Sequence, residues 1–600
     1  MIKSFSSLSV ALFLAHASLP QLMAQTLAQY KIEIEAEAAS GSWKLGIGTD
    51  AALGVLVWAD FNGNGKKDDG EGWSAARADK MGVCNFSQKR TSDKLTVYGP
   101  VTTLFCGGNG VVTLKTSANR ELRNLAANNN SISLIDLTGN IKLERVNLED
   151  NQLARLTVTG LSALVDLRLN GNSKISSLNL QGVKALQRLD ISETKISKIT
   201  NADFSTLKGI NLSAASNFDF SVLQNAALLE ELGLTGSKVT TIDLTRHPRL
   251  KTLWAPNCEF ESLDFSGNPD LSQVMLNHNK LNGADFSNNM RLRNVYLENN
   301  GLQHLRLPGE GSRVRVLNIA GVKTLTSLDL SHQTELWVLQ LDGSGVTSLD
   351  LSSNPSLGEL TMSETAISEL DLRDTPNLKT LNVAGCKELK KLDLTNSQQL
   401  NVLYCGKSGL NELDLRACEN LTEFTGEQNG FKELVFNSKS LNRVECSGNM
   451  IEGEAMTKLV NSLPRVSSGR FVVVDLSVSG SENKCTPAQV KIAKDKGWQV
   501  LDRNIGGSEY RPYPGAESTA LDELADTSVK VYPTVASRAI NVEGAASSKY
   551  YIYTMSGALV SRGELGDGLG TIPIAGLTPG SYVLRLSSVL EAFKVQVVVD

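Results

Sequence analysis

An acidic loop near the N-terminus carries the clearest metal-binding pattern in the chain. In residues 60–71, DFNGNGKKDDGE, oxygen-bearing side chains occur at loop positions 1, 3, 5, 9 and 12, and a glycine occupies position 6. This spacing matches a calcium-binding loop, in which carboxylate and amide oxygens coordinate the ion and the glycine permits a sharp turn. The expected ligands are Asp60, Asn62, Asn64, Asp68 and Glu71.

The sequence around this loop does not fit a helix–loop–helix calcium site. The preceding segment, Gly54–Phe61, is apolar and is predicted to be a strand, whereas an EF-hand loop follows a helix. Lys67 also stands where such sites have an apolar residue. Two interpretations remain: a structural Ca²⁺ loop between strands, or a Gly/Asn/Asp-rich turn that only resembles one. Apart from this Ca²⁺, no cofactor is expected.

A repeat with a period of about 21 residues organises the chain from Val101 to Leu441. A clear copy is LWVLQLDGSGVTSLDLSSNPS, Leu336–Ser356. Counting its first residue as position 0, apolar residues recur at positions 0, 3, 5, 10, 13 and 15, and the alternation around position 4 is typical of a strand. One repeat cannot bury its apolar side chains alone, whereas stacked repeats share a core. The sequence therefore predicts a β-rich leucine-rich-repeat solenoid over residues 101–450, with positions 13–16 extended rather than helical.

Position 8 of the repeat is a small polar residue in most copies. Backbone groups inside a coil need hydrogen-bond partners, and an asparagine side chain can supply both a donor and an acceptor. Cys258 and Cys386 occupy the same position, and Ala215 and Val322 interrupt it. The asparagines at this position are Asn109, Asn130, Asn151, Asn172, Asn279, Asn300, Asn429 and Asn449.

The repeat frame separates the groups that an enzyme would have to bring together. His247 and His332 fall at position 18 of two repeats that are four rungs apart, which is roughly 19 Å at the spacing of paired strands. His278 and His304 fall at other positions, and His16 precedes the repeats. The chain also lacks G-x-S-x-G, H-E-x-x-H and phosphate-loop motifs. We therefore predict no catalytic residues and no enzymatic activity.

Positions 2, 4 and 6 of the repeat are expected to face outward from the sheet. Three large side chains follow one another at position 4, and exposed aromatic residues among amides are typical of a protein- or glycan-binding hot spot. The alternative is ordinary scatter of apolar residues over a surface. The predicted ligand-binding residues are Trp254, Met275 and Tyr296, flanked by Gln273, Asn294, Asn277 and Glu298.

A second outward patch alternates in charge. Its members are expected to form a solvated lattice of ion pairs, in which each pair contributes little to stability. The residues are Arg145, Asp166 and Arg188 at position 2, with Arg168 and Asp190 at position 4.

The chain before the repeats has two parts. Lys3 followed by the apolar run from 10 to 15 predicts a secretory signal peptide over residues 1–25, cleaved near Ala24–Gln25 or Ala28–Gln29. Residues 26–100 are expected to form an N-terminal β cap that contains the acidic loop.

Three further parts follow the repeats. Two predicted helices, Gly453–Val466 and Thr486–Trp498, flank a strand at Arg470–Leu476, which indicates an α/β cap over residues 451–505. Residues 506–528 are rich in Gly, Pro and acids and are predicted to be a linker. Short strands and turns over residues 529–600 predict a small antiparallel β-sandwich.

Composition limits the classes of partner. The formal net charge is −5 and no long basic run is present, so nucleic acid is not an expected partner. No apolar run of about 18 residues follows the N-terminus, so no membrane-spanning helix is expected. The repeat frame places Cys106, Cys405 and Cys446 in the core as small apolar residues. The pairing of Cys84 and Cys485, in the two caps, stays open.

Two parts of the chain resemble known families. Residues 30–505, with the ending MTKLVNSLP…AKDKGW, resemble internalin-J-like leucine-rich-repeat surface proteins of the Bacteroidetes. The tail is similar to a type A sorting domain of the type IX secretion system, although its VVVD ending departs from the usual Lys-rich end. The residues that carry the second resemblance are Val531–Pro533, Ile552–Gly557, Leu577–Tyr582 and Phe593–Val597.

These resemblances imply an exported protein that the type IX secretion machinery releases or attaches to the outer-membrane cell surface. They also imply roles in adhesion and biofilm formation. We therefore expect an adhesin that binds a host or bacterial surface protein or glycan through the concave face of the solenoid. The alternative is a structural surface-layer spacer without a specific ligand.

Overall fold

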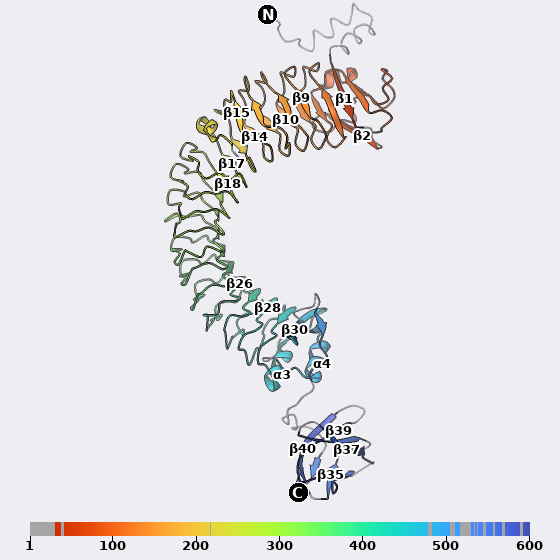
Figure 1. Cartoon of the computed structure of the whole chain (residues 1–600), viewed down its shortest axis with the longest axis vertical. Coiled ribbons are helices and arrows are strands. Elements are labelled where there is room, and N and C mark those ends of the chain that lie inside the picture. The colour runs from red at the N-terminus through yellow and green to blue at the C-terminus, as the bar shows by residue number, and fades with distance from the viewer. Residues whose placement is uncertain are drawn as a thin grey trace, which may run out of the picture. The chain divides into compact units, whose positions relative to one another are not determined.

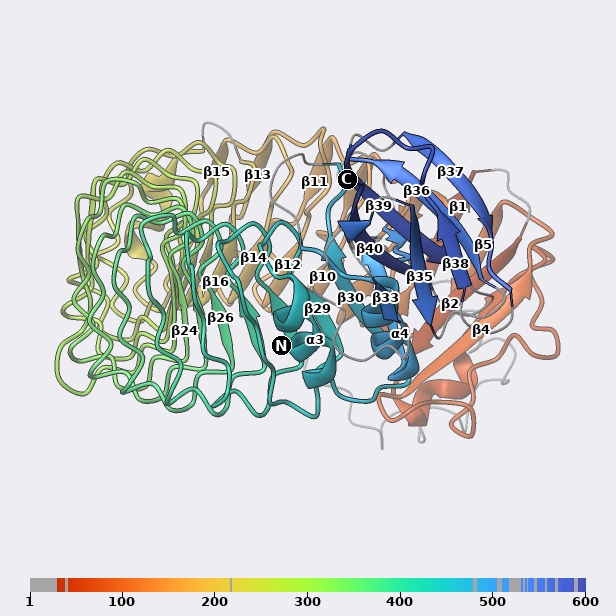
Figure 2. The same cartoon turned by 90° about the horizontal axis from the view of Figure 1, so that it is seen from below.

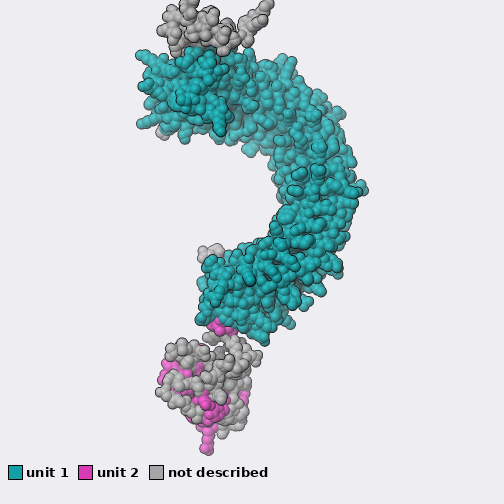
Figure 3. Space-filling view, turned by 180° about the vertical axis from the view of Figure 1, so that it is seen from behind, with its two compact units in different colours: residues 1–485, 489–513 teal, residues 486–488, 514–600 magenta. Residues whose placement is uncertain are grey.

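The computed structural model describes residues 30–37, 41–215, 218–477, 483–503 and 510–516, together with most of 530–599 except for 533–534, 537, 544–547, 556–557, 567–569 and 588–591. The chain forms two compact units (Figure 3). Unit 1 comprises residues 1–485 and 489–513, and unit 2 comprises residues 486–488 and 514–600. The predicted signal peptide and most of the predicted linker lie outside the described residues.

Unit 1 is a leucine-rich-repeat solenoid, as the period predicts. Positions 2–4 of each repeat form a three-residue strand, and each strand pairs in parallel with the same positions of the next repeat. Figure 1 shows unit 1 as an open arc with this sheet along its inner side, and Figure 2 shows its turns stacked one behind another. In order, the strands are β6 (Thr103–Phe105), β8 (Asn124–Ala126), β10 (Arg145–Asn147), β12 (Asp166–Arg168), β14 (Arg188–Asp190), β16 (Gly209–Asn211), β17 (Glu231–Gly233), β18 (Thr252–Trp254), β19 (Gln273–Met275), β21 (Asn294–Tyr296), β23 (Val316–Asn318), β24 (Val338–Gln340), β25 (Glu359–Thr361), β26 (Thr380–Asn382), β27 (Val402–Tyr404), β28 (Glu423–Thr425) and β29 (Arg443–Glu445).

The apolar positions of the repeat form one continuous core. In the copy that starts at Leu336, the six apolar positions are all buried, as predicted. The second half of the repeat is mostly turns and extended chain, which confirms the expectation that it is not helical; a 3₁₀ helix, η2 (Phe220–Asn225), is an exception. Short parallel pairs form there between β9 (Leu134–Asp136) and β11 (Arg155–Thr157), β13 (Ser177–Asn179) and β15 (Lys198–Thr200), and β20 (Gly283–Asp285) and β22 (His304–Arg306).

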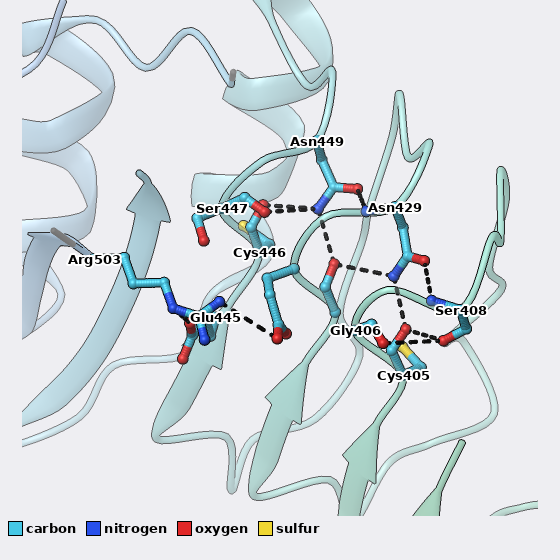
Figure 4. Close-up of polar contacts among 11 residues, drawn as sticks. Cys405, Gly406, Ser408, Asn429, Glu445, Cys446, Ser447, Asn449 and Arg503 are labelled. Atoms are coloured by element: carbon cyan, nitrogen blue, oxygen red, sulfur yellow. Dashed lines mark hydrogen bonds and ion pairs between the residues drawn. The ribbon is translucent and has the colours of Figure 1, made fainter. Parts of the chain in front are cut away.

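The asparagines at position 8 bind backbone groups of neighbouring turns. Asn279 Nδ2 donates to the carbonyl oxygens of Ala255 and Leu276, both at 2.8 Å, and Asn279 Oδ1 accepts from the Phe260 amide at 3.1 Å. Figure 4 shows two successive members, Asn429 and Asn449, with bonds of the same kind. The column therefore joins each turn to the turns before and after it, as the sequence predicts.

A second ladder, which the sequence reasoning missed, runs through position 18. Asn289 Nδ2 donates to the carbonyl oxygens of Phe265 and Asn268 at 3.0 and 2.8 Å. His247 lies in the same column, where its Nδ1 is 3.1 Å from the Ala226 carbonyl oxygen. The expected equivalence of His247 and His332 is wrong: the repeat that contains His332 is one residue longer, so Gln333 enters the column and His332 is exposed. The fully buried asparagines of this ladder are Asn119, Asn140, Asn268, Asn289 and Asn354.

The N-terminal cap closes the first turn of the solenoid. Two of its strands continue the main sheet: β2 (Ser42–Gly48) pairs antiparallel with β6, and β4 (Val83–Lys89) pairs antiparallel with β2. The predicted strand Gly54–Phe61 is only partly correct, because residues Ala51–Leu56 form a 3₁₀ helix, η1, that lays Gly54 against the Trp73 ring, where a Cβ atom would clash. The other cap strands, which pair with one another, are β1 (Lys31–Ala36), β3 (Trp58–Asp60), β5 (Lys94–Tyr98) and β7 (Val111–Lys115).

The C-terminal cap has the predicted α/β character, with shorter elements than expected. Its helices are α3 (Gly453–Ser462) and α4 (Pro487–Asp495). The strands β30 (Gly469–Val474) and β31 (Trp498–Asp502) extend the main sheet in parallel, and β32 (Arg511–Pro512) pairs antiparallel with β31. These elements cover the apolar end that the last repeat leaves open.

Unit 2 is a small β-sandwich with a core of its own, which confirms the predicted fold class of the tail. Buried Ile540, Ile552, Ile572 and Leu584 belong to this core. Its two sheets have the orders β33-β35-β38 and β34-β40-β39-β36-β37. The strands are β33 (Lys530–Tyr532), β34 (Val535–Ala536), β35 (Ala539–Glu543), β36 (Lys549–Thr554), β37 (Leu559–Glu564), β38 (Gly570–Pro573), β39 (Gly580–Ser587) and β40 (Ala592–Val599).

All eight cysteines lie within the described residues, and each is a buried, free thiol. The open question of Cys84 and Cys485 is thereby answered for this structure, since neither forms a disulfide. Burial raises the pKa of the Cys106 thiol to about 12 and that of Cys485 to about 12. Among the described residues, no helix combines the length and the apolar character needed to span a bilayer.

Candidate functional site

The predicted aromatic column lies on the main sheet, in register across β18, β19 and β21. Trp254 pairs with Met275, and Met275 pairs with Tyr296. At position 2 of the same strands, Gln273 pairs with Asn294. All seven predicted ligand-binding residues are half-buried, so each presents part of its side chain to solvent. The structure therefore brings the predicted residues together on one face.

Glu298 is the most constrained member of this set. Its Oε1 accepts from Asn318 Nδ2 at 2.7 Å, and Asn318 Nδ2 also donates to Gln340 Oε1 at 2.7 Å. Within the part of the chain that the structure describes, Glu298 Oε2 has no hydrogen-bond partner. Burial raises the pKa of the Glu298 carboxyl group. The column thus continues past Tyr296 into a polar network on β23 and β24.

A hollow of about 380 Å³, which the sequence reasoning did not anticipate, lies beside Trp254. Two outward positions on neighbouring strands are glycines, Gly209 on β16 and Gly233 on β17. The space above Gly209 is open, whereas the Asn211 side chain lies over Gly233. Glu231, Asn211 and Asp190 border the same hollow. The two glycines in adjacent repeats were a usable signal, but it becomes visible only when the repeats are aligned across their unequal lengths.

The charge-alternating patch forms the other wall of this hollow. Asp166 is 5 % exposed, and its carboxylate accepts from Arg188 Nε at 3.0 Å and Arg168 Nε at 3.3 Å. The expectation of a solvated lattice is therefore wrong for Asp166, because the two arginines cover it. It is correct for the guanidinium groups, which are exposed. Arg145 has other partners: it donates to Asn124 Oδ1 and pairs with Glu144.

A second hollow of about 360 Å³ lies farther toward the N-terminal cap. It shares Asp166 and Arg168 with the first hollow, and its opposite end is apolar at Phe105 and Met81. Met81 is 74 % exposed. The two hollows therefore adjoin at Asp166 and Arg168, and together their lining runs from Met81 to Trp254.

The predicted calcium loop is compact, and its carboxylates face its own backbone. Asp60 accepts from the amides of Asn64 at 3.1 Å and Gly65 at 2.9 Å. Glu71 Oε1 accepts from the Phe61 amide at 3.0 Å, and Glu71 Oε2 from the Asp68 amide at 2.9 Å. Gly65 has φ +72°, the left-handed conformation that the sharp turn requires.

The side chains across this loop also converge. Asp68 Oδ2 accepts from Asn62 Nδ2 at 2.6 Å and from Asn64 Nδ2 at 2.8 Å. None of the ion pairs among the described residues involves the carboxylates of this loop. Within the same residues, no group of three or more His, Cys, Asp or Glu side chains could hold a metal by itself. A calcium ion here would therefore need the amide oxygens as well, and the residues present are compatible with that donor set.

Two buried glutamates and one arginine join the last repeats to the C-terminal cap. Arg503 follows β31 and lies between Glu445, at 3.0 Å from its Nε, and Glu427, at 3.4 Å from its Nη1 (Figure 4). Glu445 is 4 % exposed and Glu427 is 8 % exposed. Burial raises the pKa of the Glu445 carboxyl group, and Arg503 opposes that shift. This cluster links β29 and the turn after β28 to the C-terminal cap.

The described histidines do not gather at one place. His247 is buried in the position-18 ladder, and desolvation lowers its pKa. His278 is exposed in a turn with φ +57°, and His304 is exposed on β22, on the side of the coil away from the main sheet. The described histidines therefore lie in separate parts of their coils.

Searches against protein-family descriptions and against curated proteins return no match for this chain. Solved structures that are similar to it contain leucine-rich repeats. The functional domain of InlJ from Listeria monocytogenes, described as including a cysteine ladder, has 19% identity and a TM-score of 0.46, over 85% of this chain and 93% of that one. YopM from Yersinia enterocolitica WA-314 has 17% identity and a TM-score of 0.39, over 58% of this chain and 87% of that one. The internalin InlF from Listeria monocytogenes has 19% identity and a TM-score of 0.31, over 57% and 86%.

Proposed function

We propose that this chain is an exported surface protein that binds a host or bacterial surface protein or glycan through the inner sheet of unit 1. The observation that carries the proposal is the register of Trp254, Met275 and Tyr296 on three neighbouring strands, each side chain half-buried. Large, amphipathic side chains held in this way provide contact area that a partner can cover.

The strand backbone makes this surface suitable for binding. Each three-residue strand is hydrogen-bonded on both sides, so the backbone under the column is already ordered before a partner arrives. A rigid surface loses less conformational entropy on association than a loop does. The half-buried amides Gln273, Asn294 and Asn277 add donors and acceptors that fix the orientation of a ligand.

The test is a screen of the full chain, without its signal peptide, on arrays of glycans and extracellular-matrix proteins. A hit should be lost in the double variant Trp254→Ala/Tyr296→Ala. Trp337→Ala is the matched control, because Trp337 is 42 % exposed but lies outside the column. No hit on any array, or equal loss of a hit in the control variant, would favour a structural spacer without a specific ligand.

An adhesin role would extend this binding to whole cells. The proposal rests on the inner-sheet surface together with the sequence resemblance to surface proteins. Cells that display the chain should attach to a ligand-coated surface and form biofilm, and cells with the Trp254→Ala/Tyr296→Ala variant should do so less, at equal surface display. Equal attachment by both strains would separate binding in vitro from adhesion.

We further propose that unit 2 serves export through type IX secretion. It has a hydrophobic core of its own, to which buried Ile540, Ile552 and Leu584 belong. Deletion of residues 529–600 should therefore leave unit 1 folded but retained in the periplasm. Surface proteolysis of the native host, with the full chain as control, measures this. If the truncated protein reaches the surface, unit 2 is an ordinary binding module.

A structural calcium ion in the acidic loop is proposed as an aid to the N-terminal cap. The loop carboxylates have no cationic partner among the described ion pairs, so a divalent cation would offset their mutual repulsion. Asp60, Asn62, Asn64, Asp68 and Glu71 would hold the ion. This role concerns stability and is independent of the binding surface.

A further inference from the structure

We infer that the hollow beside Trp254 is a subsite for a neutral, hydroxyl-rich saccharide of one or two rings. This inference rests on the proposed function, because it names the class of ligand that the inner sheet would take. It starts from the absence of a side chain at Gly209, which borders a hollow of about 380 Å³ that Trp254 also lines. That volume falls at the lower end of the range for small-molecule sites, roughly 300–1,000 Å³.

One wall of the hollow, at Trp254, suits the apolar face of a sugar ring. Leu189 and Ile210 border the hollow from the strands, but their side chains are buried in the core, so Trp254 supplies the accessible aromatic surface. The indole is half-buried and lines the hollow, so a ring can pack against its exposed part. The C–H groups of a pyranose would there replace the water that covers the indole.

The polar rim carries both donors and acceptors. The exposed guanidinium groups of Arg168 and Arg188 donate, while the carboxylates of Asp190 and Glu231 accept. A hydroxyl group can donate and accept at once, so a sugar can use both kinds of partner. This match favours a saccharide over a ligand that offers only one kind of group.

The same rim disfavours ions of either sign. A cationic peptide would meet Arg168 and Arg188, and an anionic ligand would meet Asp190 and Glu231. Asp190 is also already engaged, since Oδ1 accepts from Ser192 Oγ at 2.7 Å and Oδ2 accepts from Asn211 Nδ2 at 3.2 Å. Its remaining lone pairs suit a neutral hydroxyl better than a salt bridge that needs the whole carboxylate.

The rim is held in place before any ligand binds. Buried Asp166 accepts from both arginines, so one carboxylate fixes two guanidinium groups at the edge of the hollow. Asn211 Oδ1 in turn accepts from Ser213 Oγ at 2.7 Å. Side chains that are already oriented lose little entropy when they bind a ligand.

Gly209→Val is the decisive variant. A Cβ atom at position 209 would lie 3.6 Å from Glu231 Oε2 and 3.8 Å from the Arg188 side chain, which is ordinary contact, so the first atom of the valine side chain fits and its methyl groups should extend into the hollow. Valine also suits a strand better than glycine does. The fold should therefore persist, with an unchanged or higher melting temperature, while the subsite is filled.

The experiment measures saturation-transfer NMR and titration of the full chain with maltose, cellobiose, lactose and diacetylchitobiose, with sialyllactose and a triarginine peptide as charged probes. At least one neutral disaccharide should bind, and Gly209→Val should weaken it about tenfold or more, a difference of roughly 1.4 kcal/mol. Trp254→Ala should weaken it similarly, and Trp337→Ala should not.

Other outcomes overturn the inference. Binding of the neutral sugars that Gly209→Val does not change, or salt-sensitive binding of the charged probes in preference to them, would place the ligand elsewhere or in another class. If no saccharide binds while an array protein binds in a Trp254-dependent way, the inference fails and the proposed function stands. If neither sugar nor protein binds, both fail.

Discussion

Asn279→Ala should destabilise unit 1 strongly, although it removes only a small polar side chain. The side chain makes three hydrogen bonds to buried backbone groups: it donates to the Ala255 and Leu276 carbonyls and accepts from the Phe260 amide. Alanine would leave all three without that partner. At about 1–3 kcal/mol for each unsatisfied buried group, and with allowance for entry of a water molecule, the expected cost is about 3–6 kcal/mol.

The same column contains its own control. Ser344 occupies position 8 of another repeat and is also buried, but its Oγ has no hydrogen-bond partner among the described residues. Ser344→Ala should therefore change stability by less than about 0.5 kcal/mol. Equal costs for the two variants would show that the column acts by packing and not by its hydrogen bonds.

Hydrogen exchange of the native protein is the suitable assay, because a long repeat array can unfold in parts and has no single free energy of unfolding. Mass spectrometry of peptides that span 239–281 reports opening of the turns around Asn279, and peptides from the C-terminal cap report distant turns. The free energy of opening that exchange reports should fall by the full cost of about 3–6 kcal/mol near the substitution and by less in distant turns. A decrease of less than about 1 kcal/mol in that free energy at the Phe260 amide would refute the reasoning.

Three further results are expected. The pKa of Glu298 is raised in the folded protein above its ordinary value of 4.5, so the folded state binds the proton more tightly, and stability should fall as the pH rises through that raised value. Glu298→Gln should remove this dependence in melting curves taken from pH 4 to 8. The same pH dependence of the melting temperature in the wild-type chain and the variant would contradict the assignment to Glu298. Millimolar calcium should raise the melting temperature, and Asp60→Ala should abolish the increase; no increase for the wild-type chain would reject the calcium loop. Arg503→Ala should lower the hydrogen-exchange protection of the C-terminal cap by about 3–5 kcal/mol, because it leaves Glu445 and Glu427 buried without this cation, and Glu445→Gln in that background should recover part of the loss; no recovery would mean that the cost comes from packing.

The parts of the fold that depend on the repeat could be predicted from the sequence, because every turn has the same pattern of apolar and polar residues and must bury the same positions. The strand at positions 2–4, the asparagine column and the register of Trp254 with Tyr296 follow directly from the period. Features that depart from the repeat could not be predicted in this way. The 3₁₀ helix at Ala51–Leu56 accompanies the close approach of Gly54 to Trp73, and no local sequence pattern indicates that contact.

The proposed binding surface shows the same division. The aromatic column was visible because it repeats at one position, whereas the hollow depends on a side chain that is missing at Gly209. The burial of Asp166 likewise depends on two arginines from neighbouring strands that fold over it. In a solenoid, sequence reasoning finds what a column contains more easily than what it lacks.

The eight buried thiols can report where and when the protein opens locally. Only the thiolate reacts with alkylating agents, and a pKa of about 12, as for Cys106, Cys418 and Cys485, leaves on the order of 10⁻⁴ of the thiol ionised at pH 8. The closed protein should therefore be nearly inert to such reagents, and each alkylation event would mark a moment at which that turn came apart. Because the cysteines with a raised pKa are spread from Cys106 to Cys485, the mass of the labelled peptides would give a time-resolved map of which turns separate first, without any introduced probe.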